Sequence, residues 1–295
     1  MIEEASSGPA MGKPNSSEFY LQIDVGGCGV ISLGVLAPES DSLLPPRHYL
    51  CPRVSAPIKI DGSLSDPSWQ DVPWSADFVD ITGQDALRPT LRTRVKMGWD
   101  DDFFYVGAKL EEPHVWGTIT ERNAVMFEDN DFEIFIDPDC DGLNYYEFEI
   151  NALGSIWELS LPKPYGEGGK PVLGCNIAGL KSAVAVRGSL NDPRDVDAGW
   201  TVEVAIPWTG LRKYHTGGEA PPRSGDRWKI NFSRVQWEHR IVDGRYERIP
   251  PHGTPIAESL NPEEQEHPES NWVWSPQGAV NMHLPLRWGV VEFSG

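Results

Sequence analysis

The chain has 295 residues, with 44 Asp and Glu against 25 Lys and Arg, and its formal net charge is −19 at pH 7. This charge argues against nucleic acid and against a membrane surface as partners, because both favour clustered cations. The length allows one or two domains, and 29 Gly and 26 Pro indicate many turns. The four cysteines and seven histidines show no CxxC, HExxH or HxxxH spacing, so we expect no zinc site.

The first 54 residues differ in composition from the rest of the chain. Their first part is rich in Ser, Gly and Pro, and in the stretch 19–38 Asp24 and several glycines interrupt the apolar pattern. We predict an N-terminal extension over residues 1–54, partly disordered or forming added strands, and a domain over residues 55–295. No apolar run reaches ~18 residues and the first residues, MIEEASS, are acidic, so we expect neither a transmembrane helix nor a secretory signal.

From residue 57 onward, short segments of alternating apolar and polar residues are separated by turn residues. This spacing predicts an all-β fold, a jelly-roll-like antiparallel β-sandwich of about nine or ten strands. Helical turns are expected only at residues 66–70 and 208–211, and no GxGxxG joins a strand to a helix, so we expect no nucleotide site. The side chains expected between the sheets are Phe132, Ile134, Ile136, Phe148, Ile150, Val202, Val204 and Ile206.

Alternation also places polar side chains on the face opposite this core. In segments 131–137 and 145–151 these are Glu133, Glu147, Glu149 and Asn151. If the segments pair as a hairpin, the carboxylates gather on one face, where they could accept hydrogen bonds from sugar hydroxyls. The pattern fits an exposed acidic face equally well. Seven carboxylates lie between Glu128 and Asp141 without a Lys or Arg, so something else must offset their repulsion.

The turn between these two segments reads DPDCDG. Asp137, Asp139 and Asp141 alternate as in the opening half of a calcium-binding loop, and three such carboxylates can converge on one hard cation. The closing Glu of that loop is absent, because Phe148 takes its place. Two interpretations therefore stand, a weak Ca²⁺ site and a tight hairpin whose Asp side chains cap backbone amides.

Aromatic residues gather near the C-terminus among prolines and turns. Trp272, Trp274 and Trp288 lie there together with His283. Rings in a loop at a sheet edge can stack on a pyranose, or they can close the end of a sandwich. The same two interpretations apply to Trp116.

Taken together, these features resemble a known family. The chain contains, in this order, the motifs IDGSLSDPSW, WDDDFFYVGAKL, DNDFEIFIDPD, NYYEFEIN, GWTVEVAIPW and MHLPLRWGVVEF. They resemble the family 9 carbohydrate-binding module-like domain, a DOMON-like fold, over residues of about 56–294. The resemblance implies a β-sandwich that binds saccharides, with structural calcium nearby. It also implies a frequent association with glycosidases and with carbohydrate catabolism.

The family's best-known members hold a terminal sugar between two tryptophans, and the resemblance implies where those positions fall here. The sugar-binding acid falls on Glu133, and the two tryptophans fall on Phe127 and Met282. A family arginine falls on Glu149, which reverses its charge, and a nearby Asn is kept as Asn151. With both indoles replaced, we expect weak binding. The candidate ligand-binding residues are Phe127, Glu133, Glu149, Asn151, Met282, His283, Trp116 and Trp274.

The leading interpretation is a noncatalytic carbohydrate-binding protein that takes a mono- or oligosaccharide on this sheet face. The alternative is a glycoside hydrolase that uses Glu133 with Glu147 or Glu149, because a pair of carboxylates is all that this chemistry needs. In either case we expect a saccharide as the partner.

A third interpretation is a haem-binding sandwich. Related sandwich domains hold haem between an axial Met and an axial His, and Met126, Met282 and His283 lie close to the expected site. A Soret absorption band would identify bound haem.

Overall fold

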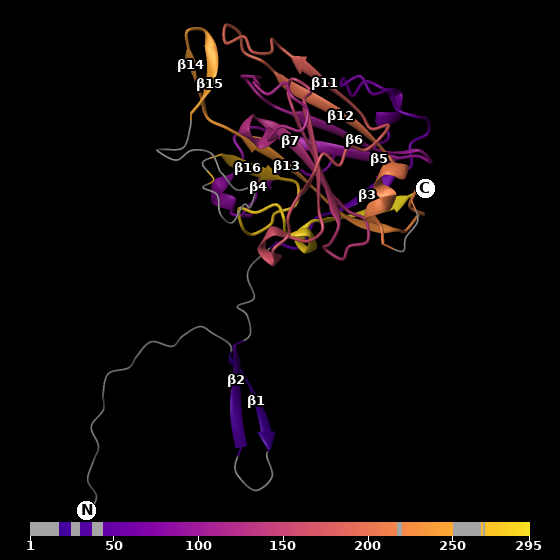
Figure 1. Cartoon of the computed structure of the whole chain (residues 1–295), viewed down its shortest axis with the longest axis vertical. Helices are drawn as coiled ribbons and strands as arrows, with labels where there is room; N and C mark the ends of the chain where they lie inside the picture. Colours follow the sequence, from indigo (N-terminus) through magenta and orange to yellow (C-terminus); the bar gives the residue numbers. More distant parts are fainter. Residues whose placement is uncertain (1–17, 25–29, 37–43, 217–219, 250–266, 268) are drawn as a thin grey trace, which may run out of the picture. The chain divides into compact units, whose positions relative to one another are not determined.

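The computed structural model describes residues 18–24, 30–36, 44–216, 220–249, 267 and 269–295. The chain divides into two units, residues 1–44 and residues 45–295 (Figure 1). In the first unit, β1 (Glu18–Asp24) pairs antiparallel with β2 (Val30–Leu36). This pair lies in the predicted extension, and the other residues of the first unit, except for Leu44, lie outside the described residues.

The second unit begins before the expected boundary at residue 55. The reason is β3 (His48–Pro52), which pairs in parallel with the last strand, β17 (Gly289–Ser294). Tyr49 and Cys51 point from β3 into the core, where they are 6% and 0% exposed. Residues 45–54 therefore belong to the domain and not to the extension.

This unit is a β-sandwich with one nine-stranded and one four-stranded sheet (Figure 1). The large sheet has the order β10-β9-β8-β7-β13-β16-β4, with β17 on β13 and β3 on β17. Its further strands are β4 (Val79–Asp80), β7 (Asp131–Asp137), β8 (Tyr145–Asn151), β9 (Ile156–Leu161), β10 (Val172–Leu173), β13 (Arg227–Gln236) and β16 (Ser270–Val273). The small sheet has the order β11-β12-β6-β5, made of β5 (Thr93–Trp99), β6 (Phe103–Leu110), β11 (Lys181–Arg187) and β12 (Gly199–Pro207).

The remaining elements are short. β14 (His239–Val242) and β15 (Arg245–Arg248) form a separate ribbon, and the single α-helix among the described residues, α1, covers only Trp208–Leu211. The 3-10 turns are η1 (Pro67–Trp69), η2 (Asp85–Leu87), η3 (Met126–Glu128), η4 (Tyr165–Glu167), η5 (Arg212–Tyr214) and η7 (Pro285–Arg287). Both helical turns expected from the sequence are present, as α1 and η1.

The inner faces of the two sheets form the main core. All eight side chains expected there are fully buried, which confirms the strand alternation: Phe132, Ile134, Ile136, Phe148, Ile150, Val202, Val204 and Ile206. Phe132 on β7 stacks on Phe232 of the neighbouring β13, with ring centroids 5.9 Å apart and planes at 14°.

The opposite face of the large sheet is covered as well. Every residue of β7, β8 and β9 is buried, so these strands carry large side chains on both faces. A second apolar cluster on the outer face includes Phe135, Trp157 and Leu159 from the strands and Met282 and Trp288 from the segment between β16 and β17. The polar face of the β7–β8 hairpin is therefore not an exposed acidic surface, because this C-terminal segment folds over it.

Candidate functional site

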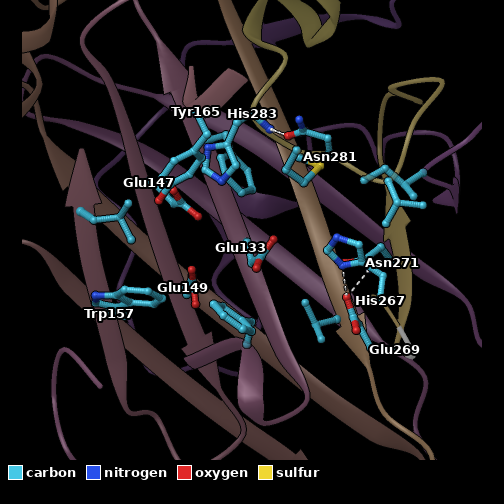
Figure 2. Close-up of a pocket in the computed structure, with 17 residues that line it drawn as sticks. Glu133, Glu147, Glu149, Trp157, Tyr165, His267, Glu269, Asn271, Asn281 and His283 are labelled. Atoms are coloured by element: carbon cyan, nitrogen blue, oxygen red, sulfur yellow. Dashed lines mark hydrogen bonds and ion pairs between the residues drawn. The ribbon is translucent and has the colours of Figure 1, made fainter. Parts of the chain in front are cut away.

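A cavity lies on the outer face of the large sheet, above β7, β8 and β9 (Figure 2). Its other walls are formed by His267, Glu269 and Asn271 and by residues 280–283. Its polar lining residues are Glu133, Glu147, Glu149, Tyr165, His267, Glu269, Asn271, Asn281 and His283. Its apolar lining includes Phe127, Phe135, Trp157, Leu159 and Met282.

Three carboxylates form the floor of this cavity. Glu133 on β7 lies directly opposite Glu149 on β8, and Glu147 follows on the same face of β8. Their exposed fractions are only 5%, 1% and 4%. Among the described lining residues there is no Lys or Arg, and His267, which could carry a positive charge, is directed at Glu269.

Burial governs the protonation of these groups. It raises the pKa of Glu133 to about 7, the nearby Ser233 hydroxyl acts to lower it, and Glu269 adds to the rise. Burial also raises the pKa of Glu147 and Glu149 well above the usual range, and the charge of Glu133 raises both further. These groups therefore take up a proton or a cation more readily than ordinary glutamates do.

Aromatic rings form one wall of the cavity beside the carboxylates. Trp157 lies opposite Glu149 in the β8–β9 register, and its ring packs on Phe127 with centroids 6.1 Å apart. The indole Nε1 of Trp157 is buried and has no hydrogen-bond partner in the described part of the chain. A flat ring beside acceptor groups and a free donor is an arrangement that suits a polyhydroxylated ring.

His283 on the opposite wall is a neutral packed side chain. Burial lowers its pKa to about 3, and its Nδ1 lies 3.0 Å from the Tyr145 hydroxyl. Tyr165 meets the imidazole edge to face at 4.6 Å. On the wall formed by His267, Glu269 and Asn271, Oε1 of Glu269 lies 2.8 Å from Nδ1 of His267. The same oxygen accepts a hydrogen bond from the side-chain amide of Asn271 at 2.9 Å.

Known proteins share this fold. The family model described as "Carbohydrate family 9 binding domain-like" matches residues 60–221. The chain belongs to this family. The match confirms the family resemblance expected from the sequence, and no curated protein is similar enough to the chain to count as a match.

Solved structures give the same fold at low sequence identity. The "putative carbohydrate-binding protein" of Bacteroides uniformis ATCC 8492 is 17% identical with a TM-score of 0.58, covering 84% of this chain and 100% of that chain. A family 9 module from Caldicellulosiruptor kristjanssonii, solved with cellotriose, is 15% identical with a TM-score of 0.51, covering 84% of this chain and 94% of that one. Its glucose complex matches at 15% identity and a TM-score of 0.50, over 84% and 96% of the two chains. These likenesses confirm the all-β sandwich.

In this family 9 binding-like domain, the cavity brings together five of the eight predicted ligand-binding residues. Phe127, Glu133, Glu149, Met282 and His283 all line it. They come from η3 and the two strands that follow it, β7 and β8, and from the C-terminal segment, which is far from these elements in the sequence. Their role in ligand binding stays a prediction.

The other three predicted residues lie outside the cavity lining and have structural contacts. Asn151 donates to Asp129 at 2.9 Å and accepts from the amide of Ser155 at 3.0 Å, which closes a turn. Trp116 packs with Trp237 in a separate apolar cluster. Trp274 is 1% exposed in the core, and its ring occupies the space where a Cβ on Gly289 would lie, 2.2 Å from the nearest ring atom.

Several lining residues were missed by the sequence analysis. Trp157 and Leu159 could have been found, because alternation along 156–161 puts them on one face of a third neighbouring strand. Tyr165, Glu269, Asn271 and Asn281 carry no such signal, since they lie at strand ends or in irregular segments whose position depends on tertiary packing.

The DPDCDG loop brings its three aspartates together, with one carboxylate oxygen of each within 4.8 Å of the others. Each carboxylate also has a backbone donor. Asp137 accepts from the amides of Cys140 at 3.1 Å and Gly142 at 2.9 Å, and Asp139 accepts from Thr216 at 2.8 Å. The capping interpretation thus accounts for these side chains, while one buried oxygen of Asp139 without a partner leaves room for the Ca²⁺ predicted here.

The residues proposed for haem are close-packed. Met126 is fully buried in the same outer cluster as Met282. His283 has the rings of Tyr165 and Phe135 at 4.6 and 5.8 Å. Aromatic side chains thus occupy the space around the imidazole that a porphyrin would need.

None of the helices in the described part of the domain has the length and apolar composition needed to cross a bilayer.

Proposed function

We propose that this family 9 binding-like domain is a noncatalytic module that binds a mono- or oligosaccharide in the cavity above β7, β8 and β9. The observation that carries the proposal is the side-by-side placement of carboxylate acceptors and the Trp157–Phe127 wall. Membership of the family supports it, and so do the cellotriose and glucose named for the Caldicellulosiruptor module. Glu133 and Glu149 would accept hydrogen bonds from sugar hydroxyls while the rings pack against a sugar face.

A glycoside hydrolase is the second candidate, and the closeness of Glu133 to Glu149 is what favours it. Retaining hydrolases need two carboxyls about 5–5.5 Å apart, one ionised and one protonated. Here burial raises the pKa of both Glu133 and Glu149. Catalytic pairs instead have environments that separate the pKa values of the two carboxyls. This common shift is the reason to prefer binding over hydrolysis.

Calorimetric titration of the full chain with a panel of mono- and disaccharides and with cellotriose tests the proposal. Glu133→Gln keeps the shape of the side chain and removes charge-assisted hydrogen bonds, which contribute about 1.5–3 kcal/mol each, so affinity should fall at least about tenfold. Glu121→Gln, an exposed glutamate away from the cavity lining, is the matched control and should bind as the wild type does. Absence of binding across the panel, or equal affinity of Glu133→Gln and wild type, would exclude this site.

A further inference from the structure

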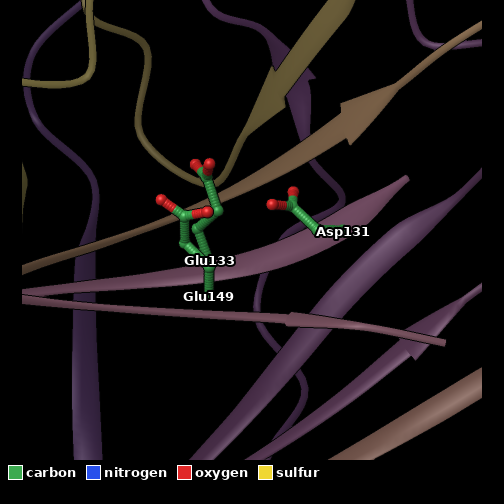
Figure 3. Close-up of side chains that lie close together, drawn as sticks. All are labelled: Asp131, Glu133 and Glu149. Carbon is green, nitrogen blue, oxygen red and sulfur yellow. The ribbon is translucent and has the colours of Figure 1, made fainter. Parts of the chain in front are cut away.

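A compact group of three acids, two of which line the cavity, lies on β7 and β8 (Figure 3). Asp131 and Glu133 extend from β7 and Glu149 from β8, and one carboxylate oxygen of each lies within 4.8 Å of the other two. Their exposed fractions are 0%, 5% and 1%. We call Asp131, Glu133 and Glu149 the sheet cluster.

Several carboxylate oxygens of the sheet cluster lack a hydrogen-bond donor among the described residues. Neither oxygen of Asp131, and one oxygen of Glu149, meets a hydrogen-bond donor in the described part of the chain. Three buried carboxylates elsewhere in the domain differ, because Asp129, Glu158 and Glu203 each accept at least two hydrogen bonds. A buried carboxylate without donors is costly unless a positive charge or a proton accompanies it.

The nearest basic side chains on the adjacent strand β13 are engaged elsewhere. Arg234 is buried on the core face of the sheet and pairs with Glu112 at 2.9 Å. Lys229 donates to the carbonyl oxygens of Leu286 and Trp288, each at 3.0 Å. Neither therefore neutralises the sheet cluster.

We propose that Asp131, Glu133 and Glu149 bind a hard divalent cation such as Ca²⁺ at the base of the cavity. Calcium takes oxygen ligands at about 2.3–2.6 Å, so two ligand atoms on one ion can be up to about 5 Å apart, which the spacing in the cluster satisfies. Three carboxylates provide three to six of the roughly six to eight oxygens that Ca²⁺ needs. Glu133 and Glu149 also line the cavity, so water or a ligand hydroxyl there can complete the shell.

The cation site shares Glu133 and Glu149 with the proposed sugar site, but it does not require a bound sugar, because the unpartnered oxygens are present whether or not a ligand occupies the cavity. It is also separate from the aspartates of the DPDCDG loop, which lie at the other end of β7 and already accept backbone hydrogen bonds. An experiment must therefore distinguish two acidic groups on one chain.

Titration of the full chain with CaCl₂, after treatment with a chelator and its removal, is the direct test. Wild type should bind Ca²⁺ without any sugar present, and Asp131→Asn and Glu149→Gln should each weaken that binding about tenfold or more. Asp139→Asn in the loop is the matched control and should keep the site. Near-ultraviolet circular dichroism verifies that each variant is folded.

Thermal unfolding supplies a second readout. Millimolar CaCl₂ should raise the Tm of wild type and of Asp139→Asn, and it should raise the Tm of Asp131→Asn much less, since an ion that binds only the folded state stabilises it. The proposal is overturned if wild type neither binds Ca²⁺ nor gains in Tm, or if Asp131→Asn binds as wild type does. Loss of binding in Asp139→Asn alone would assign the ion to the loop and leave the sheet cluster neutralised by protons.

Discussion

A group of three carboxylates lies at each end of β7, the sheet cluster at one end and the aspartates of the DPDCDG loop at the other. The loop aspartates accept hydrogen bonds from backbone amides, and the sheet cluster largely does not. In the loop, Cys140 and Gly142 adopt φ values of 60° and 80°, and their amides reach Asp137. At the sheet cluster, β7 pairs with β8 on one side and with β13 on the other. The backbone amides of β7 therefore already donate to carbonyl oxygens of these neighbouring strands. Turns can therefore satisfy acidic side chains with their own backbone amides, whereas an acid on a central strand depends on donors from other segments, on a proton or on an ion.

The largest difference between the two groups should appear on removing Asp137. Asp137→Ala leaves the buried amide of Gly142 and the amide of Cys140 without their acceptor, and we expect the free energy of unfolding at pH 8 to fall by about 2 kcal/mol. Asp141 is exposed and accepts, among the described residues, only from the amide of Leu143, so it is the control, and Asp141→Asn should stay within about 0.5 kcal/mol of wild type. Urea unfolding measures both, and equal effects would contradict the capping role of Asp137.

Removing a carboxylate from the sheet cluster should change the free energy of unfolding in the opposite direction. In the presence of a chelator, Asp131→Asn replaces a buried carboxylate, whose oxygens meet no hydrogen-bond partner among the described residues, by a neutral group of the same shape, so stability should rise by on the order of 1 kcal/mol at pH 8. Adding CaCl₂ should reverse the order of the two proteins, because wild type gains much more stability from the ion than Asp131→Asn does. A loss of stability on this substitution in chelator would show that Asp131 has a favourable partner there.

A further prediction concerns how the free energy of unfolding depends on pH through Glu133. Burial raises the folded pKa of Glu133 to about 7, above its ordinary value of 4.5, so between these values the folded protein holds a proton that the unfolded chain releases. The contribution of this group to stability is thus full at low pH and is lost as the pH rises through about 7. With chelator present, Glu133→Gln should lessen this decline, by at most about 1.4 kcal/mol per pH unit, which is what one proton contributes. Urea unfolding at several pH values measures it, and an unchanged slope would place the titration on other groups.

Much of the fold could be predicted because its signal is local. Alternation along 131–137 and 199–207 identified which side chains enter the core, and all of those named are buried there. β3 was missed because it is short and joins the sheet only through its pairing with β17, the last strand of the chain. Pairing between segments so distant in sequence leaves no periodic mark in either of them.

The candidate site was only partly predictable. Glu133, Glu149 and Trp157 share a face by strand alternation and register, which a sequence can indicate. That this face is buried depends on the segment carrying Met282 and Trp288, which folds back over it. Burial in turn raises the carboxyl pKa values and removes water as a donor, so the chemistry of the site follows from the covering segment.

The sequence by itself determined the β-sandwich, the side of β7 and β8 on which the acids lie and the family to which the chain belongs, because strand period and motif order are properties of neighbouring residues. Only the tertiary structure decided that Asp131, Glu133 and Glu149 converge in a buried place without donors, while Asp137 finds amides in its own turn. The physical reason is that desolvation and hydrogen-bond satisfaction depend on what packs above each carboxylate and on which backbone groups remain free.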